Sequence, residues 1–338
     1  MNIYYNNNNM VRILVTGGTG FIGSHLCEKL INMGYYVICL DNNSTGNVSN
    51  IKHLIDNPNF ELIIYDITSM IHLKVDYIYH LACPASPKAY QKDPIKTLDT
   101  NYIGTKNMCE LARFNNATIL FTSTSEIYGD PHISPQLESY WGNVNPIGIR
   151  SCYDEGKRIG ETLLMEYHRC YNVNIRIARI FNTYGPNMDK NDGRVVSNII
   201  NQCLSNKDIT IYGSGNQTRS FCYVDDTVNG LINLMNNDKT IGPINIGNDN
   251  EITILQLSQI ILKLFKNCSS KLVYRDLPQD DPTRRKPDLT LAKKYLLWEP
   301  SVSLEEGLNK TIHYFNSVDT IIFENIFENI FEEYSKSM

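Results

Sequence analysis

A glycine-rich turn near the start of the chain lies between two segments of different periodicity. Val11–Val15 is a short β-branched run that indicates a buried strand, and residues 17–23 read Gly-Gly-Thr-Gly-Phe-Ile-Gly. From Phe21 to Met33 apolar residues recur at helical spacing, and Gly34 is well placed to end this helix. A buried strand that turns into a helix through spaced glycines is typical of the first unit of a parallel α/β sheet.

Strands and helices continue to alternate up to about residue 180. Further strands are predicted at Tyr36–Leu40, Glu61–Tyr65, Tyr77–Leu81, Thr118–Thr122 and Asn174–Ile177, and long helices at Pro94–Phe114 and Tyr153–Tyr171. Because alternating helices cover both faces of a sheet, the pattern predicts an α/β fold with a Rossmann-type doubly wound parallel sheet over residues 11–180.

Beyond residue 180 the pattern changes. Turns that contain glycine or proline become frequent, and helices and strands mix without regular alternation. This predicts a smaller C-terminal α/β substrate lobe over residues 181–315, with part of residues 220–247 returning to the first domain. Residues 1–10 are expected to form a disordered N-terminus. Residues 316–338, in which the unit Phe-Glu-Asn-Ile is repeated over 323–331, are expected to form an amphipathic C-terminal extension.

Composition excludes several classes of partner. The 338 residues carry 31 basic and 36 acidic side chains, a net charge of −5, which offers no broad surface for nucleic acid or an anionic membrane. No run approaches the roughly 18 apolar residues of a membrane span, and the polar, Asn-rich start lacks signal-peptide features. Nine cysteines without a C-x-x-C pair favour reduced thiols over disulfides or a zinc site. We therefore expect a cytoplasmic protein without a metal ion, a nucleic-acid partner or a membrane partner.

The glycine turn has the chemistry of a dinucleotide site. Glycines permit the close approach of a pyrophosphate, whose charge is met by N–H groups at the helix N-terminus. Asp41 stands 18 positions beyond Gly23 at the end of the next strand, where a carboxylate accepts both adenosine ribose hydroxyls and repels a 2′-phosphate. Asp66, after the third strand, either receives the adenine amino group or is an ordinary turn residue. A purely structural turn would also explain the glycines, but their context favours a site for NAD over one for NADP.

A second set of residues suits proton transfer. Tyr153 and Lys157 are four positions apart on a predicted helix and so share one face. A lysine ammonium and an oxidised nicotinamide would both favour the phenolate of a tyrosine, whose ordinary pKa is about 10. Beyond the predicted strand, Thr124 could bond a substrate hydroxyl, and Glu126 would place a carboxylate beside the reacting carbon. The structural alternatives are that Tyr153 and Lys157 are an ordinary surface pair, and that Thr124 and its neighbours only cap a turn.

Longer segments carry a family resemblance. They read His-Leu-Ala-Cys-Pro-Ala-Ser-Pro at 80–87, Tyr-Trp-Gly-Asn-Val-Asn-Pro-Ile-Gly at 140–148, Ser-Cys-Tyr-Asp-Glu-Gly-Lys-Arg at 151–158, Arg-Ile-Phe-Asn-Thr-Tyr-Gly-Pro at 179–186, Asp-Gly-Arg-Val-Val-Ser-Asn at 192–198 and Asp-Pro-Thr-Arg-Arg-Lys-Pro-Asp at 281–288. Together with the glycine turn, these segments resemble the extended short-chain dehydrogenases/reductases that act on nucleotide sugars, and most closely the UDP-glucuronate decarboxylases. The resemblance runs from about Val11 to Phe315.

The resemblance implies roles for residues at matching positions. Tyr153 would take the proton of the sugar C4 hydroxyl, Lys157 would lower the pKa of Tyr153, and Thr124 would hold the C4 oxygen. Glu126 and Arg285 would lie on the C5 and carboxylate side of the sugar. NAD contacts are implied for Gly17, Gly20, Phe21, Ile22, Gly23, Asp41, Asn42, Asn43, Ser44, Asp66, Ile67, Leu81, Ala82, Thr100 and Thr183. Contacts with the UDP-sugar are implied for Tyr90, Asn182, Arg194 and Arg219. A homodimer is implied as well.

The reaction implied by the resemblance is the NAD-dependent decarboxylation of UDP-glucuronate to UDP-xylose and CO2. Oxidation of C4 to a ketone places a carbonyl β to the carboxylate, so the electrons left by CO2 delocalise as an enolate, and the hydride returns afterwards. Arg285 suits a carboxylate through bidentate pairing, and Arg285 or a water that it orients is the expected proton donor to C5. Ser125 stands where related 4,6-dehydratases have an acidic aspartate. A nucleotide-sugar 4,6-dehydratase of the dTDP-glucose type, a 4-epimerase and a catalytically silent dinucleotide-binding protein are the alternatives.

Overall fold

The computed structural model describes residues 10–277 and 284–317, and a seven-stranded parallel sheet forms its centre. The strands are β1 (Arg12–Thr16), β2 (Tyr36–Asp41), β3 (Phe60–Ile64), β4 (Tyr77–His80), β5 (Thr118–Thr124), β6 (Ile175–Ile180) and β11 (Ile244–Ile246). They lie in the order β11-β6-β5-β4-β1-β2-β3, so the chain builds outward from β1 in one direction and then in the other. This order confirms the predicted Rossmann-type doubly wound sheet.

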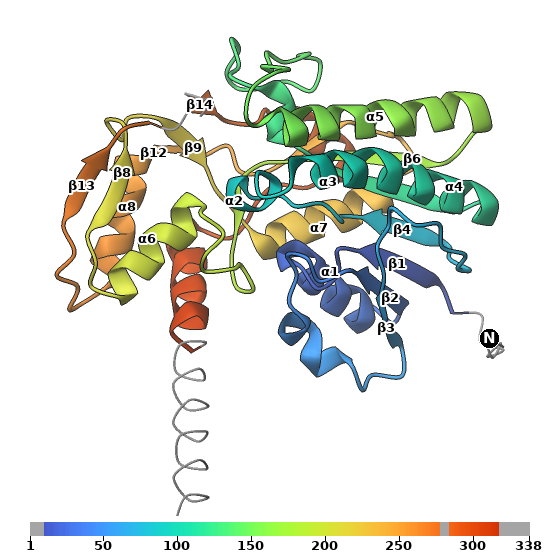
Figure 1. Cartoon of the computed structure of the whole chain (residues 1–338), viewed down its shortest axis with the longest axis horizontal. Helices are drawn as coiled ribbons and strands as arrows, with labels where there is room; N and C mark the ends of the chain where they lie inside the picture. Colours follow the sequence, from blue (N-terminus) through green and yellow to red (C-terminus); the bar gives the residue numbers. More distant parts are fainter. Residues whose placement is uncertain (1–9, 278–283, 318–338) are drawn as a thin grey trace, which may run out of the picture.

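Helices cover both faces of this sheet (Figure 1). One face carries α3 (Pro94–Asp99), the π-helical turn η2 (Thr100–Gly104), α4 (Thr105–Asn115) and α5 (Ser151–Tyr171), and the other carries α1 (Phe21–Asn32) and α7 (Val224–Met235). Val15 of β1 packs into one core with Leu26 of α1, whereas its neighbour Leu14 packs into a second core with Leu164 of α5. Because successive strand residues point to opposite faces, an apolar strand needs cover on both sides.

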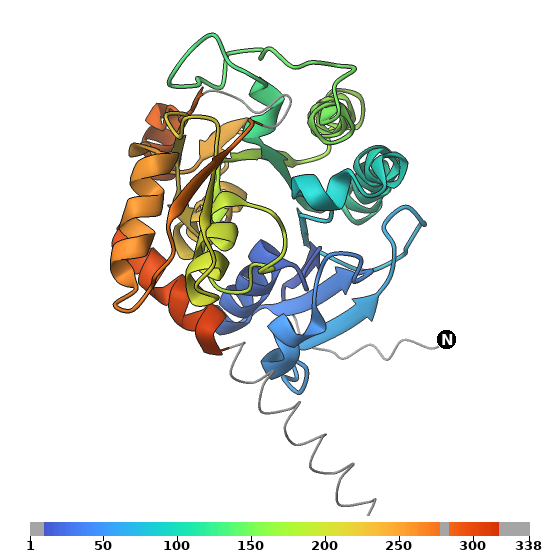
Figure 2. The same ribbon diagram turned by 60° about the vertical axis from the view of Figure 1, so that its left-hand side comes forward.

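A smaller lobe lies beside the sheet. It contains α6 (Val195–Leu204), β8 (Ile209–Tyr212), β9 (Thr218–Ser220), β12 (Glu251–Thr253), α8 (Ile254–Leu264), β13 (Leu272–Arg275) and β14 (Arg284–Arg285). Its strands form two small sheets, β12-β9-β14 and β13-β8. Figure 2 shows α8 on the side of the lobe that faces away from β1, β2 and β3.

Short elements connect these layers. They are η1 (Val48–Leu54), α2 (Pro87–Tyr90), η3 (Ser125–Tyr128), β7 (Thr183–Tyr184), β10 (Cys222–Tyr223) and η4 (Ala292–Leu296). The predicted disordered N-terminus and amphipathic C-terminal extension fall outside the described residues, except for Met10, Asn316 and Ser317. All nine cysteines are described, and each is a free thiol. Within residues 10–277 and 284–317, no helix combines the length and apolar character that crossing a membrane requires.

Candidate active site

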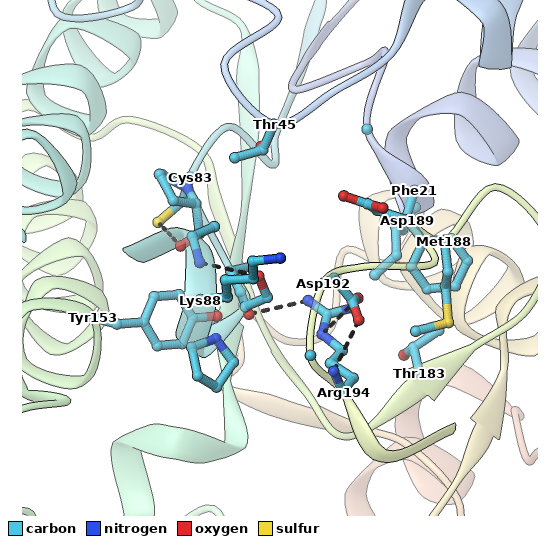
Figure 3. Close-up of a pocket in the computed structure, with 18 of the residues that line it drawn as sticks. Phe21, Thr45, Cys83, Lys88, Tyr153, Thr183, Met188, Asp189, Asp192 and Arg194 are labelled. Carbon is cyan, nitrogen blue, oxygen red and sulfur yellow. Dashed lines mark hydrogen bonds and ion pairs between the residues drawn. The ribbon is translucent and has the colours of Figure 1, made fainter. Parts of the chain in front are cut away.

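A cavity of about 1400 Å³ opens where the carboxyl ends of β1, β4, β5 and β6 meet the smaller lobe. Ligands of open α/β sheets bind at this edge, at the point where the strand order reverses. Every cofactor, substrate and catalytic residue predicted from the sequence lines the cavity, except Asn43 and Tyr90. Figure 3 shows Tyr153 on one side of the cavity and Asp192 and Arg194 on the other.

The glycine turn forms a cradle at one end of the cavity. Gly17 has a φ of +72°, and a Cβ atom there would lie 2.9 Å from the backbone nitrogen of Ala82. A Cβ at Gly23 would collide with the carbonyl oxygen of Gly17, whereas one at Gly20 would meet only that oxygen, at 3.1 Å. No side chain caps the N-terminus of α1, so its first N–H groups suit an anion. The turn therefore fits the pyrophosphate of a dinucleotide.

Two carboxylates continue this end of the cavity. Asp41 is buried and accepts hydrogen bonds from the N–H groups of Thr19 (3.1 Å) and Asn43 (2.8 Å), which hold it at the end of β2. Asn43 is thus tied to Asp41 through its backbone and does not itself line the cavity. Asp66 accepts from the Lys96 ammonium at 2.8 Å. Burial alone would raise the pKa of Asp66, but its hydrogen bonds, beginning with that from Lys96, hold the pKa well below its usual range. Asp66 is therefore ionised.

Tyr153 and Lys157 lie on the cavity face of α5. Both are buried, and the Lys157 ammonium lies 6.0 Å from the centre of the Tyr153 ring and donates to the carbonyl oxygen of Thr122 at 2.9 Å. Burial raises the pKa of the Tyr153 phenol well above its usual value, against a hydrogen bond from Thr124 that lowers it, and burial lowers the pKa of Lys157. The protein alone therefore holds Tyr153 in its neutral form. A nearby cofactor cation would favour the phenolate.

An ionic cluster lies next to Tyr153. The Oε2 atom of Glu126 accepts a hydrogen bond from Arg285 at 2.8 Å, and its Oε1 atom accepts one from Arg150 at 2.7 Å. All three side chains are nearly buried, with 12% of Glu126, 8% of Arg285 and 11% of Arg150 exposed. Burial raises the pKa of Glu126, but Arg285, Arg150 and then Arg219 outweigh it, and the pKa lies below its usual range. Glu126 is therefore an anion held between two guanidiniums.

Strand pairing places two of these arginines side by side. β14 pairs with β9, and the register sets Arg285 directly beside Arg219. Sequence reasoning missed Arg150, which lines the same cavity. Arg150 stands three positions before Tyr153 at the start of α5, so helical spacing was the signal that could have revealed it. Ser125 is buried beside Glu126 and also lines the cavity.

Tyr90 lies behind the cavity rather than in it. Its ring stacks on that of Tyr153, with centroids 5.0 Å apart and planes inclined by 6°. The side chain is 1% exposed, and the phenolic oxygen has no hydrogen-bond partner within the described residues. In this structure Tyr90 therefore supports the position of the Tyr153 ring.

Two hydrogen bonds join the sheet side of the cavity to the lobe side. Arg194 donates to the carbonyl oxygen of Ala85 at 3.0 Å, and Lys88 donates to that of Asn191 at 3.0 Å. Figure 3 shows Lys88 and Arg194 facing each other in this region. Asn182 and Thr183, at the end of β6, also line the cavity. Residues predicted to contact the substrate are therefore gathered from both parts of the protein.

Comparisons with known proteins agree with this geometry. Residues 13–247 match the model of the NAD dependent epimerase/dehydratase family. UDP-glucuronic acid decarboxylase 6 of Arabidopsis thaliana is 57% identical over 299 residues, which cover 88% of this chain and 87% of that protein. UDP-glucuronic acid decarboxylase 1 of Xenopus tropicalis is 54% identical over 304 residues, or 90% of this chain and 72% of that protein.

Solved structures show the same architecture. UDP-glucuronic acid 4-epimerase of Bacillus cereus, in complex with UDP-glucuronic acid and NAD, superimposes with a TM-score of 0.81 at 30% identity, covering 91% of this chain and all of that one. UDP-glucose 4-epimerase of Thermotoga maritima, with UDP-glucose, gives a TM-score of 0.82 at 31% identity, covering 91% of this chain and 99% of that one.

Proposed function

The chain belongs to the NAD dependent epimerase/dehydratase family, and we propose that it converts UDP-glucuronate to UDP-xylose and CO2. The observation that carries this proposal is a buried guanidinium with an unused donor. Arg285 is 6% exposed and lines the cavity, and its Nε atom has no hydrogen-bond partner within the described residues. A buried donor of this kind needs an acceptor, and a carboxylate is the acceptor that a guanidinium fits best.

The ionic cluster can hold the substrate carboxylate. Arg285 donates to Glu126 and keeps an Nε donor without a partner among the described residues. A sugar carboxylate that enters beside Arg285 would accept a hydrogen bond from this donor in a largely dry site, where pairing is strong. Ser125 adds a neutral hydroxyl that does not repel this carboxylate. The cluster thus selects a glycuronate over a neutral hexose.

Tyr153 and Thr124 suit the first chemical step, oxidation at C4. Thr124 would hold the C4 oxygen, Tyr153 would remove its proton, and Lys157 would orient the cofactor beside them. NAD⁺ bound at the glycine turn supplies the hydride acceptor and, once reduced, the hydride donor. With C4 a ketone, the bond from C5 to the carboxylate can break because the electrons enter an enolate. The carboxylate then departs as neutral CO2, which no longer pairs with Arg285.

Other residues would bind the remainder of the substrate. Asn182, Arg194 and Arg219 line the lobe side of the cavity and suit the UDP half. The adenosine half of NAD would lie on Asp41, whose carboxylate favours NAD over NADP.

We also propose that the protein is a homodimer in the cytoplasm. Apolar side chains stand exposed along the outer face of α3, η2 and α5, at Ile95, Leu98, Tyr102, Ile103 and Ile159. Such a face suits pairing with the same face of a second copy. Nine free thiols suit a reducing compartment.

Product analysis tests the proposed activity. Purified protein is incubated with UDP-glucuronate, with and without added NAD⁺. The nucleotide sugars are then separated, and their masses are measured by mass spectrometry. We expect the loss of CO2. Loss of water would indicate a dehydratase, an unchanged mass with a new retention time would indicate a 4-epimerase, and no reaction would indicate a binding protein.

A further inference from the structure

A buried glutamine lies outside the cavity, next to the segment that carries Arg285. Gln136 is 1% exposed and does not line the cavity, although its loop joins two elements that do, η3 and α5. Glutamine side chains are mostly exposed in proteins, so a buried one in a loop needs partners. Figures 1 and 2 show β14 next to this loop (green), and Gln136 forms a parallel β-bridge with Pro287. Gln136 therefore contacts the chain just beyond Arg285.

Both the backbone and the side chain of Gln136 hold residues 286–288. Its N–H group donates to the carbonyl oxygen of Lys286 at 2.8 Å, and its carbonyl oxygen accepts from the N–H group of Asp288 at 2.9 Å. Its Oε1 atom accepts from the N–H group of Lys286 at 2.8 Å, and its Nε2 atom donates to the carbonyl oxygen of Ile133 at 2.7 Å. Each polar group of Gln136 thus has a partner, and three of these four bonds fix residues 286–288.

Asn245 fastens the same contact to the central sheet. It belongs to β11 and is fully buried, and its Nδ2 atom donates to the carbonyl oxygens of Gln136 at 2.9 Å and Asp288 at 3.1 Å. Its backbone N–H group donates to the Glu138 carboxylate at 2.9 Å. Because a strand in a buried sheet is a more rigid support than a loop, the chain beyond Arg285 is anchored to the core.

Arg285 itself is held between this anchor and the lobe. On the lobe side, β14 pairs with β9, and the carbonyl oxygen of Arg285 accepts from the Ser220 hydroxyl at 3.4 Å. On the cavity side, the Arg285 guanidinium donates to Glu126, which precedes the loop of Gln136. Residues 286–288 follow Arg285 directly, so their hydrogen bonds to Gln136 help to fix the direction in which the Arg285 side chain leaves the backbone.

The position of Arg285 matters because a guanidinium pairs with a carboxylate through two parallel hydrogen bonds in one plane. We propose that Gln136 is a positioning residue, which sets the preference of the site for a UDP-sugar with a carboxylate by holding the backbone next to Arg285. This inference rests on the proposed function, in which Arg285 binds the carboxylate of the sugar. Gln136 does not touch the substrate, since it lies outside the cavity, and acts only through Arg285.

Gln136→Met tests the proposal because methionine has a similar length and packs well in a core, but it cannot accept the bond from Lys286. The KM for UDP-glucuronate and the Ki of UDP-glucose, a competitor without the carboxylate, are measured in one assay with NAD⁺. We expect the KM to rise about 10-fold and the Ki to change less than about 2-fold. A general loosening of the site would raise both constants together. A variant with the wild-type ratio of KM to Ki would overturn the proposal.

A second variant keeps the test decisive if Gln136→Met does not fold. Gln136→Asn retains a polar amide but is one methylene shorter, so it withdraws the acceptor from the N–H group of Lys286. The same ratio of KM to Ki should rise at least about 5-fold. An unchanged ratio in a folded Gln136→Asn variant would also overturn the proposal.

A double variant tests whether Gln136 acts through Arg285. Arg285→Lys keeps the positive charge but removes the planar fork, so no fork remains to be positioned. Adding Gln136→Met to Arg285→Lys should therefore raise the KM by less than about 2-fold. A further rise of about 10-fold in this background would show that the two effects are independent, which would overturn the proposal.

A matched control separates the role of Gln136 from ordinary stability. The half-buried Asn115 side chain also joins distant backbone groups, because it donates to the carbonyl oxygen of Leu73 at 2.9 Å and accepts from the N–H group of Val75 at 3.3 Å, away from the cavity. Asn115→Leu should lower Tm and leave the ratio of KM to Ki unchanged. If it shifted this ratio as Gln136→Met does, the ratio would report only stability, and the proposal would fail.

The wild-type protein tests the proposed function by itself. Formation of UDP-xylose, with a KM for UDP-glucuronate well below the Ki of UDP-glucose, supports the role of Arg285. No UDP-xylose, or no preference for the carboxylate, would refute the proposed function. A wild type with both properties and a Gln136→Met variant with an unchanged ratio would refute only the role of Gln136.

Discussion

Arg285 and Glu126 are separated by 159 positions in the chain, yet the Arg285 guanidinium donates to the Glu126 carboxylate at 2.8 Å inside a buried cluster. The pairing of β14 with β9 brings Arg285 to this point, and η3 brings Glu126. The contact therefore joins the lobe to the edge of the central sheet. It also sets the charge of the region where a sugar carboxylate would bind.

The Glu126→Gln variant tests whether this cluster supports activity or is only an ordinary buried ion pair that supports stability. The amide cannot hold two guanidiniums as the carboxylate does, so we expect the kcat/KM for UDP-glucuronate to fall at least about 100-fold. The measurement is steady-state turnover, together with thermal unfolding. Breaking a buried pair destabilises a protein by about 3–5 kcal/mol, so a loss of stability accompanies the loss of activity.

Glu161→Gln is the matched control for that variant. Glu161 pairs with Arg179 at 2.8 Å with similar burial, but it does not line the cavity. We expect a comparable drop in stability with nearly full activity in the folded fraction. If both variants lost the same specific activity, the cluster around Glu126 would have no special role.

Tyr153→Phe should abolish turnover and leave cofactor binding intact. The change removes one buried hydroxyl from α5, and the loss of a general base lowers rates by about 10²–10⁴-fold. Product formation and NAD binding, the latter by calorimetry, are measured on the same preparation. Tyr167→Phe on the same helix serves as the control, because its hydroxyl bonds to Glu110 at 2.7 Å and not in the cavity. Turnover by Tyr153→Phe at the wild-type rate would show that Tyr153 is not the catalytic base.

Gly20→Ala and Gly23→Ala should separate cofactor binding from folding. A Cβ at Gly20 would lie 3.1 Å from the carbonyl oxygen of Gly17 and would occupy the cradle, so we expect the Kd for NAD to rise at least about 10-fold, with a smaller fall in Tm than in Gly23→Ala. A Cβ at Gly23 would collide with the carbonyl oxygen of Gly17, so Tm should fall. Calorimetric titration and thermal scans provide the two readouts. Unchanged NAD affinity in Gly20→Ala would exclude this turn as the pyrophosphate site.

Asp41→Asn should weaken the preference for NAD over NADP. The amide keeps acceptor capacity through one oxygen but no longer repels a 2′-phosphate. We expect the Kd for NAD to rise about 10-fold and the ratio of the two dissociation constants to approach one. Binding of both dinucleotides is measured side by side. An unchanged ratio would show that another group sets the preference.

Much of the sheet could be predicted from the sequence because its strands are short apolar runs that end at polar turns. The predicted boundaries of some strands and helices differ from the observed ones by a few residues. The strand predicted to end at Thr122 continues as β5 to Thr124, because the backbone of Ser123 and Thr124 still pairs with β6. The helix predicted over Pro94–Phe114 is interrupted by the π-helical turn Thr100–Gly104, which periodicity alone does not indicate.

Less of the cavity could be predicted from the sequence, because the contacts between its residues depend on tertiary packing. The resemblance placed Arg285 and Glu126 on the same side of the sugar, but nothing in their spacing indicates that they touch. Arg150 precedes Tyr153 by about one helical turn and lies outside the segments that carry the family resemblance. Tyr90 was expected to contact substrate, whereas the structure stacks it on Tyr153 behind the cavity.

The transfer of the C4 hydrogen of the sugar decides whether decarboxylation proceeds through a transient ketone. UDP-glucuronate deuterated at C4 is converted by the purified protein in ordinary water, and the UDP-xylose formed is examined by mass spectrometry and NMR. We expect the product to keep its deuterium at C4, because the hydride that leaves in the first step returns to the same carbon. UDP-xylose with only hydrogen at C4, or a reaction that releases no CO2, would contradict the mechanism.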